Sequence, residues 1–221
     1  MNIQERIKRL FRLRFAILYP LAVFVAVYSR ATAASIGLGL CFIAPGVFLR
    51  LWSNSYAVKT EKLTTCGPYA FVRNPLYLGT LLILLGFVFL VQIYWVGIAA
   101  LAAFTFAYIR TIGKEEFLLE DMYKDDYRAY KKAVPSFIPR FTPYNVGERW
   151  SFSFERLRRS KEHKIFIWIG VGIVGLYLKE KLMVEKAAFD QSMLALIILA
   201  VVLAALDLAE ESWRKKDQGQ S

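Results

Sequence analysis

The sequence predicts an all-α integral membrane protein with about six transmembrane helices and one amphipathic cytoplasmic helix. Of its 221 residues, 57% are hydrophobic and the mean hydropathy is +0.38, whereas soluble domains are only about half apolar. The apolar residues form separate runs, several of which approach the roughly 20 residues needed to cross a bilayer. Lys and Arg collect between alternate runs, as they do in loops that stay in the cytoplasm.

Six apolar runs are the candidate spans. They cover residues 13–29, 34–52, 76–92, 94–112, 165–178 and 193–208. The last two are shorter than the usual span. They are either spans shortened by snorkelling lysines or a hairpin packed at the interface, and we favour spans.

The positions of Lys and Arg give the orientation. Short loops rich in these residues remain cytoplasmic. Basic residues precede the first span, lie between spans two and three, and end the chain: Arg6, Lys8, Arg9, Arg12, Arg14, Arg50, Lys59, Lys62, Arg73, Arg214, Lys215 and Lys216. Both termini are therefore predicted to be cytoplasmic.

The net charge of +11 does not indicate a nucleic-acid-binding protein. The basic residues are divided among juxtamembrane segments instead of forming one face with stacking aromatics, so attraction to anionic lipid accounts for them. Cys41 and Cys66 are not expected to form a disulfide. No metal site is expected, because the two cysteines lie far apart and His163, the single histidine, reads as a solvated loop residue.

The stretch CGPYAFVRNPLYLG, residues 66–79, stands where the third span begins. Asn74 can cap that helix and Pro75 suits its first turn. Capping leaves Tyr69, Arg73 and Tyr77 unexplained. A helix N-terminus also offers unpaired N–H groups to an anion, so this stretch is a candidate binding site.

A second group of polar residues ends the fourth span: Tyr108, Arg110, Glu115 and Glu116. The short turn after the third span predicts an antiparallel hairpin, which brings these residues beside Arg73. We expect Arg73 and Arg110 to face each other across a cavity. A structural Arg–Glu ion pair that pins the hairpin is the alternative. The small side chains of Ala99, Ala103 and Ala107 would let the two spans approach closely.

The residues after Glu116 predict an amphipathic helix. Leu119, Tyr123, Tyr127 and Tyr130 follow helical spacing, and charged residues fill the opposite side. Pro135 ends the pattern. This helix is expected either to dock on lipid headgroups or to fold back over the mouth of the hairpin as a lid.

The chain divides into three parts. Residues 1–142 hold four spans and the amphipathic helix, with the cofactor pocket mainly in residues 63–142. Residues 143–164 form a basic aromatic linker, which is either an interfacial amphipathic segment or an ordinary connector. Residues 165–221 form a helical hairpin and a basic tail.

The two polar stretches together resemble a known family. GPYAFVRNPLYLG, followed by RTIGKEEFLLEDMYKDDYRAYKKAVPSFIPRF, is similar to the isoprenylcysteine carboxyl methyltransferase family of integral membrane methyltransferases, which are related to the phospholipid methyltransferases. The resemblance covers residues 63–141 in detail. It implies a cytoplasmic S-adenosylmethionine pocket and methyl transfer to a lipophilic acceptor, such as an isoprenylcysteine-like carboxylate or a lipid head group.

The resemblance implies roles for individual residues. The family signature falls on Arg73, Asn74, Pro75, Tyr77 and Gly79, although the family usually has histidine where this chain has Asn74. Its paired glutamates match Glu115 and Glu116, and its functional arginine matches Arg110.

The chemistry of the cofactor suits the same residues. Glu115 or Glu116 would bind its amine or hydroxyls, Arg73 its carboxylate, and Tyr69, Tyr77 and Leu78 its apolar surface. Arg110 and Glu115 are the expected catalytic residues, because the planar fork of Arg110 matches an acceptor carboxylate.

Two other functions remain open from the sequence. One is an NADPH-dependent membrane reductase of the sterol reductase kind, which would need a cluster of cations for the extra phosphate. The other is a non-catalytic lipid-binding or partner-binding membrane module.

Overall fold

The computed structural model describes residues 20–58, 62–147 and 149–218, with side chains described up to residue 210. Helices account for most of this part of the chain, and it contains no strand. After a helical segment at residues 20–28, the elements are α2 (Ala33–Tyr56), η1 (Gly67–Ala70), α3 (Pro75–Val91), α4 (Tyr94–Ala133), α5 (Phe154–Ser160), α6 (Glu162–Lys179), η2 (Glu180–Val184) and α7 (Gln191–Gln218). This confirms the all-α fold class.

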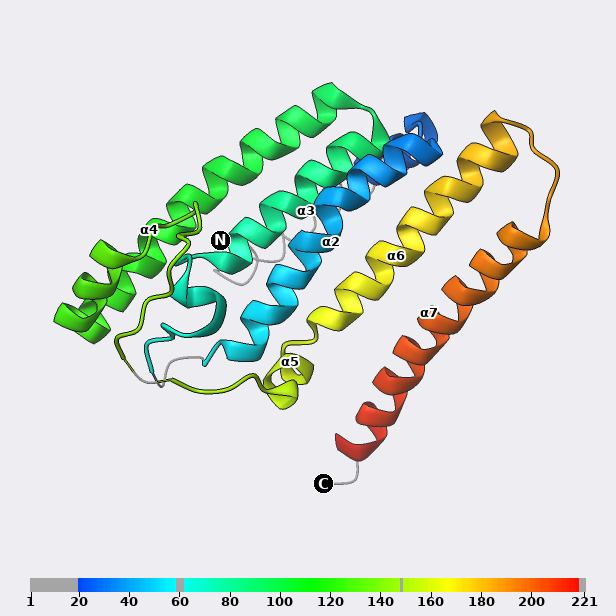
Figure 1. The fold of residues 1–221 in the computed structure, drawn as a ribbon. Coiled ribbons are helices and arrows are strands. Elements are labelled where there is room, and N and C mark those ends of the chain that lie inside the picture. Colours follow the sequence, from blue (N-terminus) through cyan, green and yellow to red (C-terminus); the bar gives the residue numbers. More distant parts are fainter. Residues whose placement is uncertain (1–19, 59–61, 148, 219–221) are drawn as a thin grey trace, which may run out of the picture.

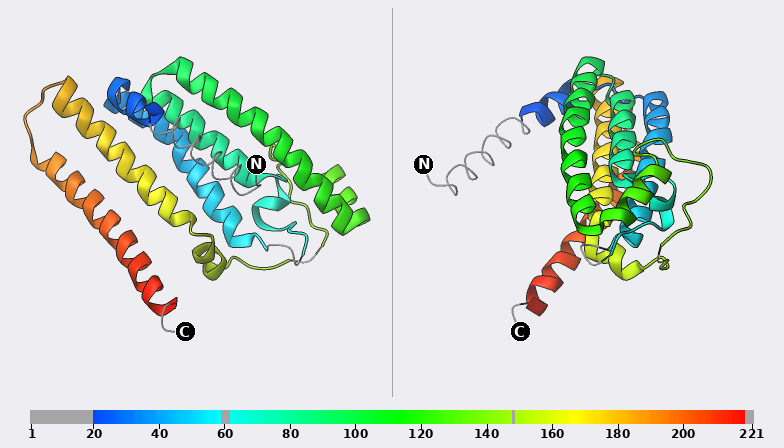
Figure 2. Two further views of the ribbon diagram at one scale, coloured as in Figure 1. Left: turned by 180° about the vertical axis from the view of Figure 1, so that it is seen from behind. Right: turned by 90° about the vertical axis from the view of Figure 1, so that its left-hand side faces the viewer.

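The long helices lie side by side in the order α4, α3, α2, α6, α7 (Figures 1 and 2). Three helical stretches are long and apolar enough to cross a membrane, namely α2, α4 and the Gln191–Glu210 part of α7. α3 is apolar but has 17 residues, and α6 contains Glu162, Lys164 and Lys179. The first predicted span lies partly outside the described residues. The count of six spans stays a prediction.

α2 and α3 pack most closely, through two pairs of glycines. A Cβ atom added to Gly39 would lie 2.8 Å from the carbonyl oxygen of Gly86, and one added to Gly46 would lie 2.7 Å from that of Gly79. Only glycine allows backbones to approach this closely. Gly79, predicted to bind cofactor, therefore contacts α2 instead.

α3 and α4 form the predicted antiparallel hairpin. Gln92 adopts a left-handed conformation between them, and Gly97 packs directly on Val88. The predicted contact through Ala99, Ala103 and Ala107 is wrong, because all three are exposed. A single glycine near the turn supplies the close approach.

The part of α4 that follows Glu116 is not the straight helix that its periodicity predicts. Lys124 has φ 44° and ψ −113°, outside the helical region, and the chain reverses there. Lys131 Nζ lies 3.0 Å from Glu116 Oε2, although these residues would be about 22 Å apart along a straight helix. We call residues 125–133 the fold-back segment.

The aromatic face predicted for this region is buried by the reversal. Tyr127 is 2% exposed, Tyr130 3% and Val134 1%. Leu63, Leu119, Tyr123 and Tyr144 pack against them. The same side chains that would line one face of a long helix thus meet across the turn at Lys124.

Residues 143–164, predicted as a linker, pack on the preceding part. The amide of Tyr144 donates to the carbonyl of Ala70 at 2.9 Å, and the indole of Trp150 donates to the carbonyl of Tyr56 at 2.8 Å. The sequence suggested that His163 lies in a loop, and this prediction is wrong. His163 belongs to the first turn of α6, where Nε2 lies 3.4 Å from Glu210 on α7.

Candidate functional site

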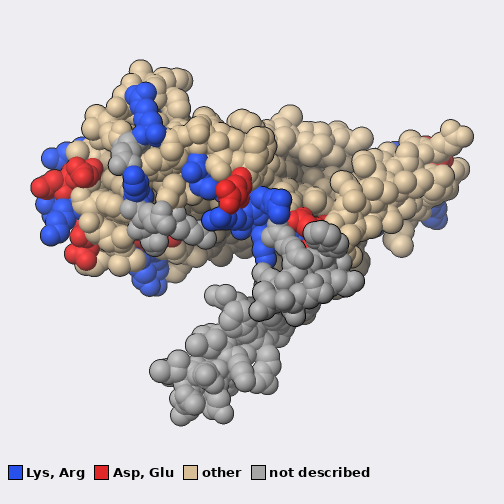
Figure 3. Space-filling view, turned by 90° about the horizontal axis from the view of Figure 1, so that it is seen from below, with Lys and Arg blue, Asp and Glu red and all other residues tan. Residues whose placement is uncertain are grey.

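The site lies at one end of the bundle, where α2 and α4 end and α3 begins. Figure 3 shows Lys, Arg, Asp and Glu gathered toward the side of the molecule that α4 occupies. Charged side chains are costly in hydrocarbon and cheap in water, so this end suits a site that a polar molecule reaches from solution.

A cavity of about 240 Å³ occupies this end. Residues from four segments line it: the end of α2 and the loop after it, the segment around η1, α4, and the fold-back segment. They are Ala57, Val58, Lys62, Leu63, Thr64, Tyr69, Arg73, Asn74, Glu115, Glu116, Leu119, Met122, Tyr123, Tyr127 and Tyr130. The lining therefore combines charged side chains with four tyrosines.

Arg73 and Glu116 form a shielded ion pair at the cavity. Arg73 Nη1 lies 2.9 Å from Glu116 Oε1, and their side chains are 12% and 16% exposed. Lys131 of the fold-back segment reaches the other oxygen of Glu116 at 3.0 Å. Arg73 Nε is nevertheless buried without a hydrogen-bond acceptor in the described part of the chain, whereas Nη1 is occupied by the ion pair with Glu116. The guanidinium thus keeps donor capacity for an anion.

Glu115 has a different environment. Its Oε1 accepts a 2.7 Å hydrogen bond from the hydroxyl of Tyr77, and the Tyr77 ring packs edge-on against Tyr108. Within residues 20–58, 62–147 and 149–210, no cation forms an ion pair with Glu115. Its carboxylate faces the cavity and can accept a cation.

The backbone around Arg73 is held by the segment after α4. The amide of Arg73 donates to the carbonyl of Pro135 at 2.9 Å, and the hydroxyl of Tyr130 donates to the carbonyl of Tyr69 at 2.7 Å. Asn74 precedes α3 as expected, but its side chain does not cap the helix. Its amide nitrogen donates instead to Ser136 Oγ at 2.9 Å.

The aromatic wall is uncharged at neutral pH. Burial, followed by the nearby charge of Glu116, raises the pKa of Tyr127 to about 12. Burial also raises the pKa of Tyr130. These phenols offer apolar faces and neutral hydroxyl groups to a ligand.

The structure brings together only part of the predicted site. Tyr69, Arg73, Asn74, Glu115 and Glu116 line the cavity, and Tyr77 reaches it through Glu115. Pro75, Leu78 and Gly79 do not line it. Pro75 and Gly79 are buried in helix packing.

Arg110 is not where the sequence had predicted. Its side chain is exposed, its guanidinium lies 4.5 Å from the centre of the Phe106 ring, and it does not line the cavity. Arg110 follows Tyr108 by two positions, which is about 200° around a helix. Because Tyr108 faces α3, Arg110 points away from Arg73.

Sequence reasoning missed several residues at the cavity. Tyr123, Tyr127 and Tyr130 were assigned to a helix face but not to a binding site, and Lys131 was not singled out. Their aromatic spacing was visible, whereas the reversal at Lys124 was not. No group of three or more His, Cys, Asp or Glu side chains with metal-binding geometry occurs in the described residues.

Comparisons with known proteins find similarity in the part of the chain that forms most of the cavity. Residues 34–126 match the family model described as phospholipid methyltransferase. The chain is 27% identical over 139 residues to the cobalt-zinc-cadmium resistance protein CzcN of Cupriavidus metallidurans, covering 62% of this chain and 63% of that protein. It is 26% identical over 145 residues to the nickel-cobalt-cadmium resistance protein NccN of Alcaligenes xylosoxydans xylosoxydans, covering 65% and 67%.

No solved structure matches the chain significantly. The family match begins at the start of α2 and ends beyond the turn at Lys124, so it includes both halves of the Arg73–Glu116 ion pair. Residues 34–126, less than half of the chain, are thus similar to the phospholipid methyltransferase family, which is part of the group of membrane methyltransferases of the isoprenylcysteine carboxyl methyltransferase type.

Proposed function

We propose that the protein transfers a methyl group from S-adenosylmethionine to a lipophilic acceptor in the membrane. The observation that carries this proposal is the cavity between the segment around η1, α4 and the fold-back segment, which Arg73 and Glu115 both line. The family match of residues 34–126 supports methyl transfer at a membrane.

The residues present fit this cofactor, which carries an amine, a sulfonium, a carboxylate and a ribose. Glu115 has a free carboxylate for a cationic group. Arg73 has one buried guanidinium nitrogen, Nε, that lacks both a hydrogen-bond acceptor and an ion-pair contact in the described residues, and this nitrogen suits a carboxylate. Glu116 is already paired with Arg73 and Lys131, so Glu115 is the better partner for the amine or sulfonium.

The cavity must become larger before the cofactor can bind in it. About 240 Å³ is slightly less than the roughly 300 to 1,000 Å³ of sites for drug-sized molecules. The fold-back segment supplies Tyr127 and Tyr130 to the wall, and its displacement would enlarge the space. We therefore propose that this segment moves outward when the cofactor binds.

When bound, the cofactor supplies an electrophilic methyl group on sulfur. The chain's own residues orient it and keep water away, which can lower the barrier by several kcal/mol. Glu115 holds the cationic end, Arg73 the carboxylate, and the tyrosines cover the aromatic end. Arg110 has no part in this arrangement, so an acceptor carboxylate would need another cationic partner.

The test is transfer of a labelled methyl group into total lipid and protein extracts by the purified protein in detergent. We expect label in an apolar product with the wild type and with Asp121→Asn, an exposed position on α4 outside the cavity. We expect at least about a tenfold lower rate with Glu115→Gln, because a hydrogen bond to a charged group contributes about 1.5 to 3 kcal/mol.

Other binding results would support the two alternative functions, a reductase or a non-catalytic membrane module. Saturable binding of NADPH without binding of S-adenosylmethionine or S-adenosylhomocysteine would favour the reductase. Binding of none of these three would favour a non-catalytic membrane module. Label transfer that is equal in wild type and Glu115→Gln would contradict the assignment of the site.

A further inference from the structure

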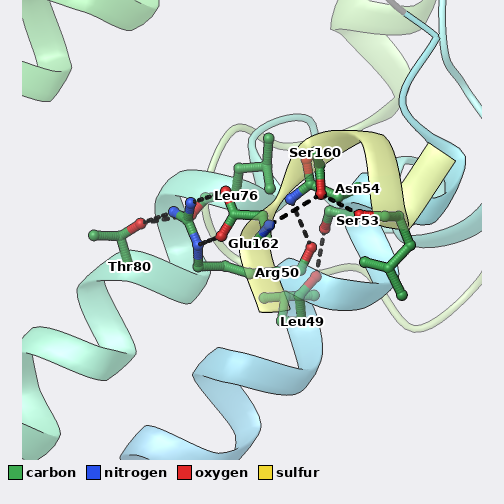
Figure 4. A network of polar contacts seen from close by, with 9 residues as sticks. Leu49, Arg50, Ser53, Asn54, Leu76, Thr80, Ser160 and Glu162 are labelled. Atoms are coloured by element: carbon green, nitrogen blue, oxygen red, sulfur yellow. Dashed lines mark hydrogen bonds and ion pairs between the residues drawn. The ribbon is translucent and has the colours of Figure 1, made fainter. Parts of the chain in front are cut away.

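Arg50 on α2 joins three helices next to the cavity (Figure 4). Its Nη1 donates to the carbonyl of Leu76 at 3.3 Å and to Thr80 Oγ1, both near the start of α3. Its Nε and Nη2 donate to the two carboxylate oxygens of Glu162 at 3.1 and 2.5 Å. The guanidinium therefore fixes the start of α3 relative to α2 and α6.

Both members of this ion pair are shielded from solvent. The side chain of Arg50 is 19% exposed and that of Glu162 12%. A two-pronged Arg–carboxylate contact is among the stronger polar contacts in proteins. Removing one member of a shielded pair leaves the other charge without a partner, and that is strongly unfavourable. Glu162 is the ion-pair partner of Arg50 in the described residues.

The position of Arg50 makes its charge relevant to the site. A cation beside a helix N-terminus is unfavourable, because the N-terminus is itself the positive end of the helix dipole. Glu162 offsets this by bringing a negative charge to the first turns of α3. Arg73 and Asn74, which directly precede α3, line the cavity.

The charge of Arg50 also acts on Tyr69, a residue of the cavity wall. Burial raises the pKa of Tyr69, the charge of Glu115 raises it further, and the charge of Arg50 lowers it. Tyr69 lines the cavity. Glu115 and Arg50 thus act on the same phenol with opposite sign, so an unbalanced Arg50 would oppose the field that Glu115 creates for a cation.

We propose that Glu162 is a positioning residue of the candidate site, which acts through Arg50 to hold the start of α3 and to neutralise a cation beside the cavity. Glu162 lies outside residues 34–126, which match the family model. The C-terminal part of the chain would then contribute to ligand selection without touching the ligand. This inference rests on the proposed function, because it concerns the charge of the same ligand.

The test compares two ligands that differ in charge at sulfur. S-adenosylmethionine carries a sulfonium, whereas S-adenosylhomocysteine carries a neutral thioether. We expect Glu162→Gln to weaken binding of S-adenosylmethionine at least fivefold more than binding of S-adenosylhomocysteine in calorimetric titrations of the full chain. The matched control is Glu155→Gln on α5, whose side chain is 73% exposed and paired with Arg159; it should leave both affinities unchanged.

Equal weakening of both ligands by Glu162→Gln would show that Glu162 matters for shape alone and would overturn the charge-balancing role. Unchanged affinities for both would overturn the whole inference. If the wild type binds neither ligand, the proposed function fails, and with it the ligand selectivity assigned to Glu162.

A measurement without ligand tests the positioning role separately. Thr80 Oγ1 and the Leu76 carbonyl are both partners of Arg50, so hydrogen exchange of the peptide covering residues 76–80 should be faster in Glu162→Gln. Glu155→Gln should exchange like the wild type. Identical exchange in all three proteins would contradict the positioning role even if the wild type binds no ligand.

Discussion

The hydroxyl of Tyr77 lies 2.7 Å from Glu115 Oε1, so the start of α3 is bonded directly to α4 at the candidate site. This bond orients the one cavity carboxylate that has no ion-pair partner among the described side chains. It connects a residue of the first polar stretch with one of the second. The two stretches therefore form one site, as the hairpin topology predicts.

Removing this hydroxyl should lower the affinity for the ligand but change the stability of the fold only slightly. Tyr77→Phe keeps the ring against Tyr108 and loses one hydrogen bond, which contributes about 0.5 to 1.5 kcal/mol. We expect several-fold weaker binding of S-adenosylhomocysteine and a small change in Tm. Tyr94→Phe, at an exposed tyrosine at the opposite end of the hairpin, is the control. Unchanged affinity in Tyr77→Phe would mean that Glu115 needs no orientation.

The site predicted from the sequence and the site in the structure differ at Arg110. The sequence predicted Arg110 as a catalytic residue, whereas the structure places this side chain on the exposed face of α4. We expect Arg110→Ala to change cofactor affinity less than twofold. A loss of affinity of tenfold or more would show that Arg110 reaches the cavity in another conformation of α4.

The fold-back segment should loosen when its contact with Glu116 is removed. Lys131→Gln deletes the ion pairs of Lys131 with Glu116 and Glu120, so hydrogen exchange in residues 125–133 should become faster. Lys132→Gln changes the same charge at an exposed neighbouring position and should have no such effect. Equal exchange in the two variants would argue against Lys131 as the residue that holds the segment.

Gly79 should matter for stability through contact with α2. A Cβ atom at Gly79 would lie 2.7 Å from Arg50 Cγ and 2.8 Å from the Gly46 carbonyl oxygen, while one at Gly37 would meet nothing within 4 Å. Overpacking of this kind typically costs about 1 to 3 kcal/mol. We expect a clearly lower Tm for Gly79→Ala in detergent and none of this loss for Gly37→Ala. Similar Tm values for both would contradict the close packing of α2 and α3.

The sequence predicted the helices well, because apolar runs of this length and the prolines and glycines at their ends depend on local chemistry. Pro75 begins α3, and the turn after Val91 produces the hairpin. The packing partners were less predictable. Ala99, Ala103 and Ala107 looked like a contact surface, but nothing in the sequence shows that Gly39 and Gly46 lie opposite Gly86 and Gly79.

The site was predictable where local geometry determines it and not where the chain reverses. The hairpin brings the start of α3 beside α4, so Arg73 and Glu116 lie close enough to form an ion pair. The sequence left open a helix that folds back over the mouth of the hairpin. It has no signal for a reversal at Lys124, which has φ 44° in a non-glycine residue, so it did not assign Tyr127, Tyr130 or Lys131 to the cavity. The pairing of Arg50 with Glu162 joins residues 112 positions apart and depends on where α6 packs.

The most direct test of the account is calorimetric titration of the purified protein with S-adenosylhomocysteine. We expect saturable binding by the wild type and by Asp121→Asn, and at least about tenfold weaker binding by Glu115→Gln, since that variant removes the charge of Glu115. Absence of saturable binding by a folded wild-type protein, or equal affinities in all three proteins, would contradict it.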